Sequence, residues 1–203
     1  MKLYGDLLSP FVRMSMVTAL EAGLESRVQL QSAALKPHEV NEALAKLSPL
    51  GKIPILETDH GRPLYDSRVI MEYFCHVAGN KALLADDGAK HFRVLTLLAL
   101  AQGLGDAAVA LRYETAARPP TAHWPEYAER LRARIRAALD ELEGQWAETL
   151  AEVNLGSIAT AVALGYLDVR HDALAWRNGR GHLATWYEAF SNRPSMLKTQ
   201  PKV

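Results

Sequence analysis

The sequence is poor in the residues that build disulfides and metal sites. Its 203 residues include a single cysteine, Cys75, so no internal disulfide can form and the chain suits a reducing compartment. The seven histidines show no paired His-x-x-x-His spacing, and with one cysteine they predict no metal site. Cys75 follows two aromatic residues deep in a predicted helix, where nothing lowers its pKa. We therefore expect this thiol to pack in a core rather than to react.

Net charge and long apolar runs are also absent. Lys plus Arg and Asp plus Glu each number 23, and a net charge of zero does not favour nucleic acid or an acidic membrane surface. The arginines at positions 130, 132, 134 and 136 are expected to form the solvated flank of a helix. The most apolar stretches, near 94–104 and 158–167, are shorter than the roughly 20 residues that span a bilayer. No apolar leader segment follows the N-terminus. We predict a cytoplasmic protein with no nucleic-acid or membrane partner.

Residues 1–79 carry the pattern of an α/β domain. Ser9-Pro10 has the form of a helix start, with serine as N-cap and proline at the first helical position, and the apolar stripe that follows stops at Gly23. Asp66-Ser67 begins a second amphipathic helix in the same way. A short helix is predicted from His38 to Lys46. Strands are predicted at 2–4, 28–31, 55–57 and 63–65. The resulting order is βαβ followed by ββα.

The rest of the chain shows helical periodicity without a convincing strand. Residues 80–88 have the composition of a linker, and residues 89–203 are predicted to form an all-helical domain. Long helices are expected around 94–104 and 127–146. The stretch 158–167 is apolar on all sides, which is typical of a buried central helix.

The stretch around Pro54 joins the two halves of the α/β domain. Proline cannot donate to a sheet ladder, so Pro54 is expected at the first residue of a strand. The preceding Ile53 is restricted to extended backbone, and its free N–H and C=O can pair with an extended, peptide-like ligand. Local sequence alone favours a trans bond here, because only about 5–6% of X–Pro bonds in folded proteins are cis.

Taken in order, these segments resemble the glutathione S-transferase superfamily, most closely its bacterial members with a serine in the N-terminal active-site position. The resemblance extends over nearly the whole chain, with one departure. In the family the central helix usually begins with Ser/Thr-x-x-Asp, which implies a start at Ser157 here, but the third position on is Thr160. We therefore expect Thr160→Asp to stabilise the fold. The resemblance implies a thioredoxin-like N-terminal domain, an all-helical C-terminal domain, and a cis proline at position 54. The segments that carry it are Ser9-Pro10-Phe11-Val12-Arg13, Pro49-Leu50-Gly51-Lys52-Ile53-Pro54-Ile55-Leu56, Asp66-Ser67, Ala163-Leu164-Gly165-Tyr166-Leu167, Trp186-Tyr187-Glu188-Ala189-Phe190 and Arg193-Pro194-Ser195.

The resemblance implies a site for glutathione, a tripeptide with two carboxylates, an α-amine and a thiol. In the family, the residue that matches Ile53 pairs its backbone with the cysteinyl part, like an added strand. The residues that match Asp66 and Ser67 hold the γ-glutamyl end, since a helix N-terminus binds a carboxylate and an acidic side chain meets an amine. Without the resemblance, Asp66-Ser67 is interpreted as a helix cap only. The remaining glutathione-binding candidates are Ser9, Phe11, Pro54, Lys52 and Lys36, with His38 as an alternative to the lysines.

Ser9 is the predicted catalytic residue. Lowering the pKa of a thiol by two units requires about 2.7 kcal/mol of thiolate stabilisation. One charge-assisted hydrogen bond contributes about 1.5–3 kcal/mol, and a helix N-terminus about 0.3–1 kcal/mol more. The Ser9 hydroxyl can therefore stabilise the glutathione thiolate without a base. The alternative is that Ser9 only caps its helix. Tyr4 is the other hydroxyl nearby, but its place in a strand favours the core.

We expect a glutathione transferase that acts on small electrophiles, with a role in detoxification. The alternatives are a glutathione-binding or protein-interaction module that has lost turnover, and a glutathione-dependent peroxidase. Glutathione is the expected co-substrate. The electrophile pocket is predicted between Leu7-Leu8 and the C-terminal helices, with Tyr113 and Trp176 at its wall. The resemblance also implies a homodimer, formed through the helix after Ser67 and the helix at 94–104.

Overall fold

The computed structural model describes residues 1–36, 38–85 and 88–202. The chain divides into two compact units. One comprises Met1–Asp86 together with Pro194–Val203, and the other comprises Asp87–Arg193. The described residues from Pro194 onward thus belong by their packing to the first unit, which the order of elements along the chain does not indicate.

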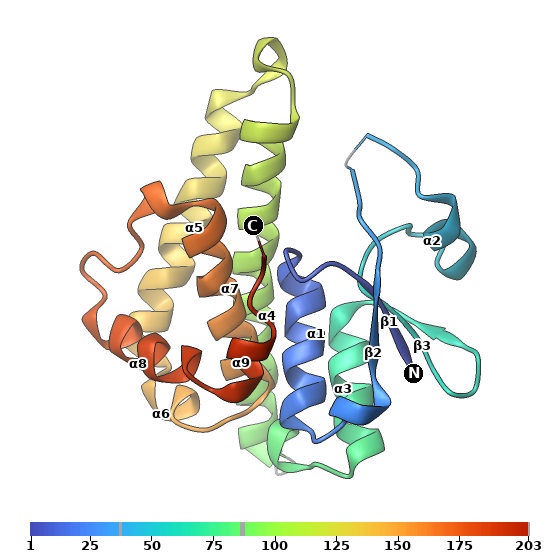
Figure 1. Cartoon of the computed structure of the whole chain (residues 1–203). Coiled ribbons are helices and arrows are strands. Elements are labelled where there is room, and N and C mark those ends of the chain that lie inside the picture. Colours follow the sequence, from blue (N-terminus) through green and yellow to red (C-terminus); the bar gives the residue numbers. More distant parts are fainter. Residues whose placement is uncertain (37, 86–87, 203) are drawn as a thin grey trace. The chain divides into compact units, whose positions relative to one another are not determined.

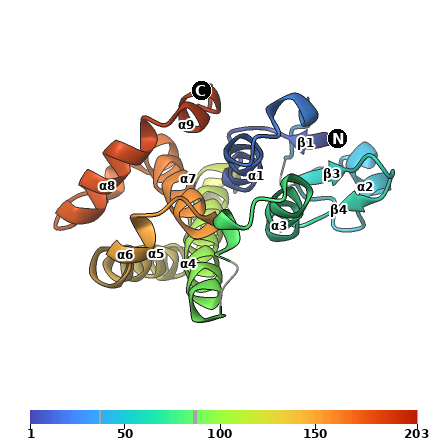
Figure 2. The same ribbon diagram turned by 90° about the horizontal axis from the view of Figure 1, so that it is seen from below.

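The first unit is built on a four-stranded sheet with the strand order β2-β1-β3-β4. The strands are β1 (Lys2–Gly5), β2 (Gln29–Ser32), β3 (Ile55–Glu57) and β4 (Pro63–Leu64). Strand β1 runs parallel to β2 and antiparallel to β3, and β3 is antiparallel to β4. Helices α1 (Pro10–Glu21) and α3 (Ser67–Ala78) lie side by side on one face, and α2 (Glu42–Leu47) lies on the other side of the sheet (Figures 1 and 2). Short 3-10 helices follow α1 at Glu25–Arg27 and α3 at Ala82–Leu84. The predicted thioredoxin-like order is confirmed.

Packing between the sheet and α1 fixes the start of that helix. Leu3 and Leu56 from the strands and Val12 from α1 are fully buried in one apolar cluster. Gly5, at the end of β1, has φ +152, and a Cβ on it would lie only 2.4 Å from Val12 Cγ2. The absence of a side chain therefore allows the first turn of α1 to approach the strand closely.

A C-terminal segment packs against α1 from the same unit. It contains the short helix α9 (Pro194–Lys198). The buried guanidinium of Arg13 donates to the carbonyl of Met196 over 3.1 Å and lies 3.5 Å from Thr199 Oγ1. At the end of α1, Ser195 Oγ donates to Glu21 Oε1. These contacts join both the first turn and the end of α1 to the C-terminal segment.

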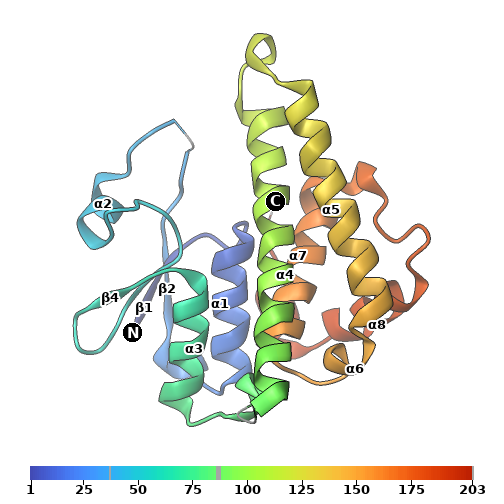
Figure 3. The ribbon, with the colours of Figure 1, turned by 180° about the vertical axis from the view of Figure 1, so that it is seen from behind.

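The second unit is all helical, as predicted. Helix α4 (Gly88–Arg112) continues into a π-helical turn at Tyr113–Ala117 and packs against both α5 (Pro125–Gln145) and α7 (Leu155–Arg170) (Figure 3). The remaining elements are α6 (Ala147–Leu150), α8 (Gly181–Ser191) and the 3-10 helices Pro120–Ala122 and Asp172–Leu174. Every residue of α7 from Leu155 to Leu167 is buried, which confirms the central helix. A Cβ on Gly156 would meet Leu97 at 2.7 Å, so glycine allows α7 to approach α4 closely.

The predicted start of the central helix is wrong. Helix α7 begins at Leu155, with Asn154 as N-cap and Ser157 as the reciprocal residue of a complete capping box. Thr160 lies inside the helix at 0% exposure, and its Oγ1 donates to the carbonyl of Gly156. An aspartate at this position would bury a carboxylate, so the expected stabilisation by Thr160→Asp is also wrong in sign.

Two further helices differ in length from the prediction. Helix α2 begins at Glu42 after the N-cap Asn41, whereas His38 lies in a turn. Helix α4 is much longer than 94–104, and Gly88–Ala117 is long and apolar enough to cross a membrane by length and composition. The most apolar window of that stretch is 56% buried inside the protein, which is the environment of a core helix.

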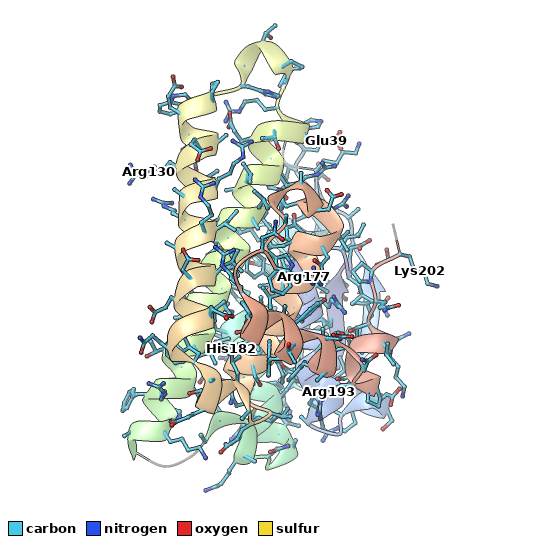
Figure 4. All side chains as sticks on the ribbon, turned by 90° about the vertical axis from the view of Figure 1, so that its left-hand side faces the viewer. Glu39, Arg130, Arg177, His182, Arg193 and Lys202 are labelled. Carbon is cyan, nitrogen blue, oxygen red and sulfur yellow. The ribbon has the colours of Figure 1, made fainter. Side chains whose placement is uncertain are left out.

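The arginine-rich face of α5 lies in solvent, as predicted. Arg130 points away from the helix (Figure 4), and Arg134 is also exposed. Arg132 and Arg136 form ion pairs with Glu129.

Candidate functional site

The strand register brings the predicted site segments to one end of the sheet. Tyr4 lies opposite Ile55, so the loop after β1 and the residues before β3 lie at the same end. Leu64 lies opposite Leu56, and β4 runs toward this end, so Asp66 follows there. The segment after β2 also starts there, since Ala33 N donates to the carbonyl of Gly5. The sheet thus gathers Ser9, Ile53 and Asp66, which are far apart in sequence.

Ser9 is the N-cap of α1, and its hydroxyl keeps a free proton. Its Oγ accepts from Val12 N at 3.5 Å, the limit of a hydrogen bond, and its own N–H donates to Asp6 O at 2.9 Å. The side chain is half-buried and donates to no acceptor in the described part of the chain. A hydroxyl accepts and donates at the same time, so the cap leaves one hydrogen for a ligand.

The loop before Ser9 is held by its own aspartate. Asp6 Oδ1 accepts from Leu8 N at 2.7 Å, which closes a turn of the type that aspartate forms with its own backbone. Leu7 and Leu8 are half-buried and adjoin the helix start. Phe11, the second residue of α1, is half-buried as well.

The backbone of Ile53 is unpaired within the described residues, as the sequence indicates. The Ile53–Pro54 bond is cis, as the resemblance implies. Pro54 is buried and Ile53 half-buried, and β3 begins only at Ile55. Neither the N–H nor the C=O of Ile53 has a hydrogen bond to another described residue. An extended ligand segment can therefore pair with it.

Asp66 caps α3 with one of its two carboxylate oxygens. Its Oδ1 accepts from Arg68 N at 3.0 Å, while Oδ2 has no partner in the described part of the chain. The side chain is exposed, whereas the adjoining Ser67 is buried at 3% exposure. The Tyr65–Asp66 bond is cis. The cap interpretation is confirmed, and it leaves one charged oxygen available beside a helix N-terminus.

The candidate cations differ in their partners. Lys36 forms an ion pair with Glu39 over 2.9 Å, and the His38 ring lies 3.5 Å from the same carboxylate. Lys52 is exposed and pairs with none of the residues that the structure describes. Of the three, Lys52 is therefore the one with an uncompensated charge.

Tyr4 and Cys75 are both engaged elsewhere. Tyr4 is half-buried and donates to Glu57 Oε2 at 3.0 Å, and burial is the main reason that its pKa is raised. Cys75 is 2% exposed, and burial raises the pKa of its thiol to about 12, with a smaller contribution from Glu72. The Cys75 thiol is therefore not a nucleophile at neutral pH. The Tyr4 hydroxyl already donates its hydrogen bond to Glu57 and is not available to a glutathione thiolate. Across the described ranges, no three His, Cys, Asp or Glu side chains are grouped so that they could hold a metal ion.

The structure corrects one residue of the predicted pocket wall. Trp176 is 2% exposed, and its indole N–H donates to Asp168 Oδ1 at 2.7 Å. The guanidinium of Arg177, labelled in Figure 4, lies 4.4 Å from its ring centroid and pairs with the same aspartate. Trp176 is a core side chain of the helical unit and offers a ligand almost no surface. Tyr113 is 42% exposed, and its place in a pocket stays a prediction.

Sequence reasoning gave no role to Arg13, although it belongs to the Ser9–Arg13 run. The available signal was a charged residue on α1 beside the apolar stripe that contains Val12 and Met16. A guanidinium in such a position must find buried partners. It finds them in the C-terminal segment, which periodicity does not reveal.

Known proteins resemble the chain over its full length. Residues 8–77 match the description "Glutathione S-transferase, N-terminal domain" and residues 125–189 match "Glutathione S-transferase, C-terminal domain". The "Uncharacterized GST-like protein YibF" of Escherichia coli (strain K12) is 35% identical, over 99% of this chain and 98% of that protein.

Two crystal structures of a glutathione transferase family member from Pseudomonas fluorescens Pf-5 share this fold. One, with bound glutathione, has a TM-score of 0.97 and 45% identity and covers 100% of this chain and 99% of that chain. The other, with bound S-(propanoic acid)-glutathione, has a TM-score of 0.91 and 44% identity and covers 100% of both. The chain belongs to the glutathione S-transferase family.

Proposed function

We propose that the protein is a glutathione transferase whose Ser9 hydroxyl stabilises the glutathione thiolate for attack on small electrophiles. The observation that carries this proposal is the gathering of three incompletely bonded groups at one end of the sheet. They are the Ser9 hydroxyl, the Ile53 backbone and the second carboxylate oxygen of Asp66. A relative that is 45% identical binds glutathione.

Each of these groups suits a different part of glutathione. The Ile53 N–H and C=O pair with the cysteinyl residue as an added antiparallel strand. Asp66 accepts from the α-amine, while Ser67 and the N-terminus of α3 hold the γ-glutamyl carboxylate. Lys52, with its uncompensated charge, meets the glycine carboxylate, and Lys36 is the weaker candidate because Glu39 already pairs with it.

Placed at this point, the thiol adjoins Ser9 and the N-terminus of α1. A charge-assisted hydrogen bond of about 1.5–3 kcal/mol, with about 0.3–1 kcal/mol from the helix dipole, lowers a thiol pKa by one to three units. The thiolate is the nucleophile. Ser9 donates a hydrogen bond and is not itself deprotonated.

The ligand of one relative indicates acceptors to test. S-(propanoic acid)-glutathione is a thioether that carries a carboxylate on the added group. We propose small unsaturated carboxylic acids, such as acrylate, as acceptors for this protein. The thiolate sulfur forms a bond to the β-carbon, the electrons of the C=C bond move to the α-carbon, and that carbon takes a proton from water.

The main alternative is a glutathione-binding module without turnover. The hydrogen bond from Val12 N to Ser9 Oγ favours it, because the same geometry serves a helix cap. Such a module keeps every binding group named above. It differs only in lacking rate enhancement.

The decisive experiment compares Ser9→Ala with wild type and with Ser26→Ala, an exposed serine of the same unit. We expect kcat/KM for conjugation to fall about 10- to 100-fold in Ser9→Ala, the loss of one hydrogen bond to a charged group. Glutathione affinity, measured by calorimetry, should change little, and the thiol pKa seen in the pH–rate profile should rise. Ser26→Ala should match wild type. Unchanged conjugation in Ser9→Ala would reject Ser9 as activator, and an absence of turnover in wild type would favour the module.

We also propose a cytoplasmic homodimer. Val69 on α3 and Phe92 on α4 are 46% and 69% exposed, and these are the two helices expected at the dimer interface. Light scattering after size exclusion tests this. A monomer at micromolar concentration would contradict it.

A further inference from the structure

The first turn of α1, which follows Ser9, is held from two sides within the first unit. On one side, Val12 lies against Gly5 of β1, where an added Cβ would come within 2.4 Å. On the other side, Arg13 contacts the C-terminal segment, whose helix α9 lies beside α1 (Figure 2). The backbone N–H of Arg13 also donates to the carbonyl of Ser9 at 3.0 Å. A displacement of Arg13 therefore displaces Ser9 as well.

The guanidinium of Arg13 is buried against polar atoms of the C-terminal segment. Its Nη2 donates to the carbonyl of Met196 at 3.1 Å, and its Nε lies 3.5 Å from Thr199 Oγ1. Both of these residues are buried as well. Thr199 Oγ1 donates its own hydrogen to the carbonyl of Ser195 at 2.8 Å, so its oxygen can accept from Arg13. A buried charge requires partners of this kind, and they determine where the side chain lies.

The C-terminal segment also contacts the far end of α1. Ser195 Oγ donates to Glu21 Oε1, and Lys198 forms an ion pair with Glu25 just beyond the helix. Along the axis of an α-helix, Glu21 lies about 18 Å from Ser9, whereas Arg13 lies only about 6 Å from it. The segment is thus attached to α1 at a second place that does not involve Arg13. Attachment alone does not explain why a buried charge stands in the first turn.

The cap of α1 does not by itself fix the Ser9 hydroxyl. The bond from Val12 N to Ser9 Oγ is 3.5 Å long, which is the limit of a hydrogen bond. A hydrogen bond from this hydroxyl to a ligand depends steeply on distance and angle, and misplacing a catalytic group by about 1 Å can cost about 100-fold in rate. The packing around the first turn must therefore determine where the hydroxyl lies.

We propose that Arg13, held by Met196 and Thr199, is a positioning residue that places the Ser9 hydroxyl for the glutathione sulfur. The inference rests on the proposed function, in which Ser9 donates a hydrogen bond to the thiolate. It adds that a segment distant in sequence takes part in thiolate stabilisation by acting through α1.

The test compares the two contacts that the C-terminal segment makes with α1. Arg13→Lys keeps the positive charge but lacks the planar group, so any direct effect of the charge on the thiolate is retained. Thr199→Val removes one acceptor of Arg13 at nearly constant shape, and Thr199→Ser restores it. Ser195→Ala is the matched control, because it breaks the bond to Glu21 at the far end of the same helix. Melting temperatures verify that each variant is folded under the conditions of the assay.

The main readout is the pKa of the bound glutathione thiol, measured from the ultraviolet absorbance of the thiolate at saturating glutathione. We expect Arg13→Lys to raise this pKa by about 0.5, which lowers the thiolate fraction about 3-fold at a pH below the pKa. The kcat for conjugation at that pH should fall by the same factor, with little change in KM for glutathione. Thr199→Val should cause a smaller rise, while Thr199→Ser and Ser195→Ala should match wild type. A merely structural role would lower melting temperatures and leave the thiol pKa unchanged.

Ser9→Ala, measured in parallel, separates this inference from the proposed function. If Ser9→Ala raises the thiol pKa while Arg13→Lys and Thr199→Val leave it at the wild-type value, the positioning role is overturned and the proposed function stands. If glutathione does not bind, or Ser9→Ala leaves the thiol pKa unchanged, the proposed function fails.

Hydrogen exchange then tests the placement of Ser9 without any ligand. The backbone N–H groups of residues 12 and 13 both bond to Ser9. If they exchange at least about 3-fold faster in Arg13→Lys than in Ser195→Ala, the contact with the C-terminal segment holds the turn that carries Ser9. Equal exchange in the two variants would overturn the inference.

Discussion

Two helix N-termini in this protein use the same kind of cap in different ways. At α7, Asn154 Oδ1 accepts from Ser157 N and Ser157 Oγ accepts from Asn154 N, both over 2.9 Å, and the Asn154 amide also donates to Thr149 O. At α1, Ser9 Oγ accepts only from Val12 N, at 3.5 Å, and no reciprocal bond returns from Val12. The first cap is closed and the second is open.

The difference follows from what surrounds each helix end. Asn154 is 2% exposed and Ser157 0%, so every donor and acceptor there must be satisfied within the chain. Ser9 is half-buried at the end of a sheet, where water or a ligand can complete its bonding. A closed cap contributes to folding. An open cap keeps a donor for binding.

The largest effect is expected from Thr160→Asp, which places a charge beside the closed cap. Thr160 is fully buried, and an uncompensated buried carboxylate typically destabilises a protein by about 3–5 kcal/mol. Burial raises the pKa of the new carboxyl above its unfolded value of about 3.9, so the loss should shrink as the pH falls below that raised pKa and should be smallest near about pH 4. Urea denaturation at two pH values measures this, with Thr160→Val as the control of similar shape. A variant as stable as wild type at pH 7 would contradict the described start of α7.

The next effect is expected from Asn154→Ala, which removes the closed cap. The substitution removes the acceptor for Ser157 N and the donor to Thr149 O, so the free energy of unfolding should fall by about 2 kcal/mol. Glutathione affinity should stay unchanged. Asn41→Ala is the matched control, since Asn41 caps the short and largely exposed α2. If both variants lost the same free energy of unfolding, burial would not determine how much a cap stabilises its helix.

The helix caps also show which helix starts can be predicted from the sequence and which cannot. Ser9-Pro10 and Asp66-Ser67 were recognised because a cap residue directly precedes a clear apolar stripe. Asn154 and Ser157 are both good cap residues, three positions apart, and local pattern does not choose between them. Tertiary burial decides, and the helix starts one turn earlier than predicted. The same competition starts α2 at Glu42, with Asn41 as N-cap, instead of at the predicted His38. Pro37, which directly precedes the predicted helix, lies outside the described residues.

Side-chain roles beyond one element were harder still to predict. The four strands and their register bring Ser9, Ile53 and Asp66 to one end of the sheet, which the βαβ-ββα order allowed us to expect. The local sequence around Trp176 does not indicate that its indole is buried with Asp168 as hydrogen-bond partner. The local sequence around Arg13 does not indicate that its guanidinium contacts the C-terminal segment. Both depend on contacts between segments distant in sequence, which periodicity within one element does not contain.

A smaller effect is expected from Arg13→Lys. The open cap at Ser9 contributes little to the stability of α1, so the contacts of α1 with the C-terminal segment matter more. Lysine keeps the charge but lacks the planar group that reaches Met196 O and Thr199 Oγ1 together. We expect the free energy of unfolding to fall by about 1 kcal/mol. The control is Lys198→Ala in the same C-terminal segment, which breaks an exposed ion pair with Glu25. It should cause no measurable change in the free energy of unfolding. If Arg13→Lys also has no effect, the C-terminal segment does not hold α1.

The smallest effect on stability, with the largest on turnover, is expected from Ser9→Ala. Its cap bond is at the limit of hydrogen-bond length, so the variant should lose only a few tenths of a kcal/mol, below the usual value of a cap. Asn154→Ala should do the reverse, losing stability and keeping its catalytic rate once folded. Measuring unfolding and conjugation on both proteins gives a double contrast. If Ser9→Ala lost as much stability as Asn154→Ala while conjugation held, the open cap would be a structural cap after all, and its free hydrogen would have no part in binding the thiolate.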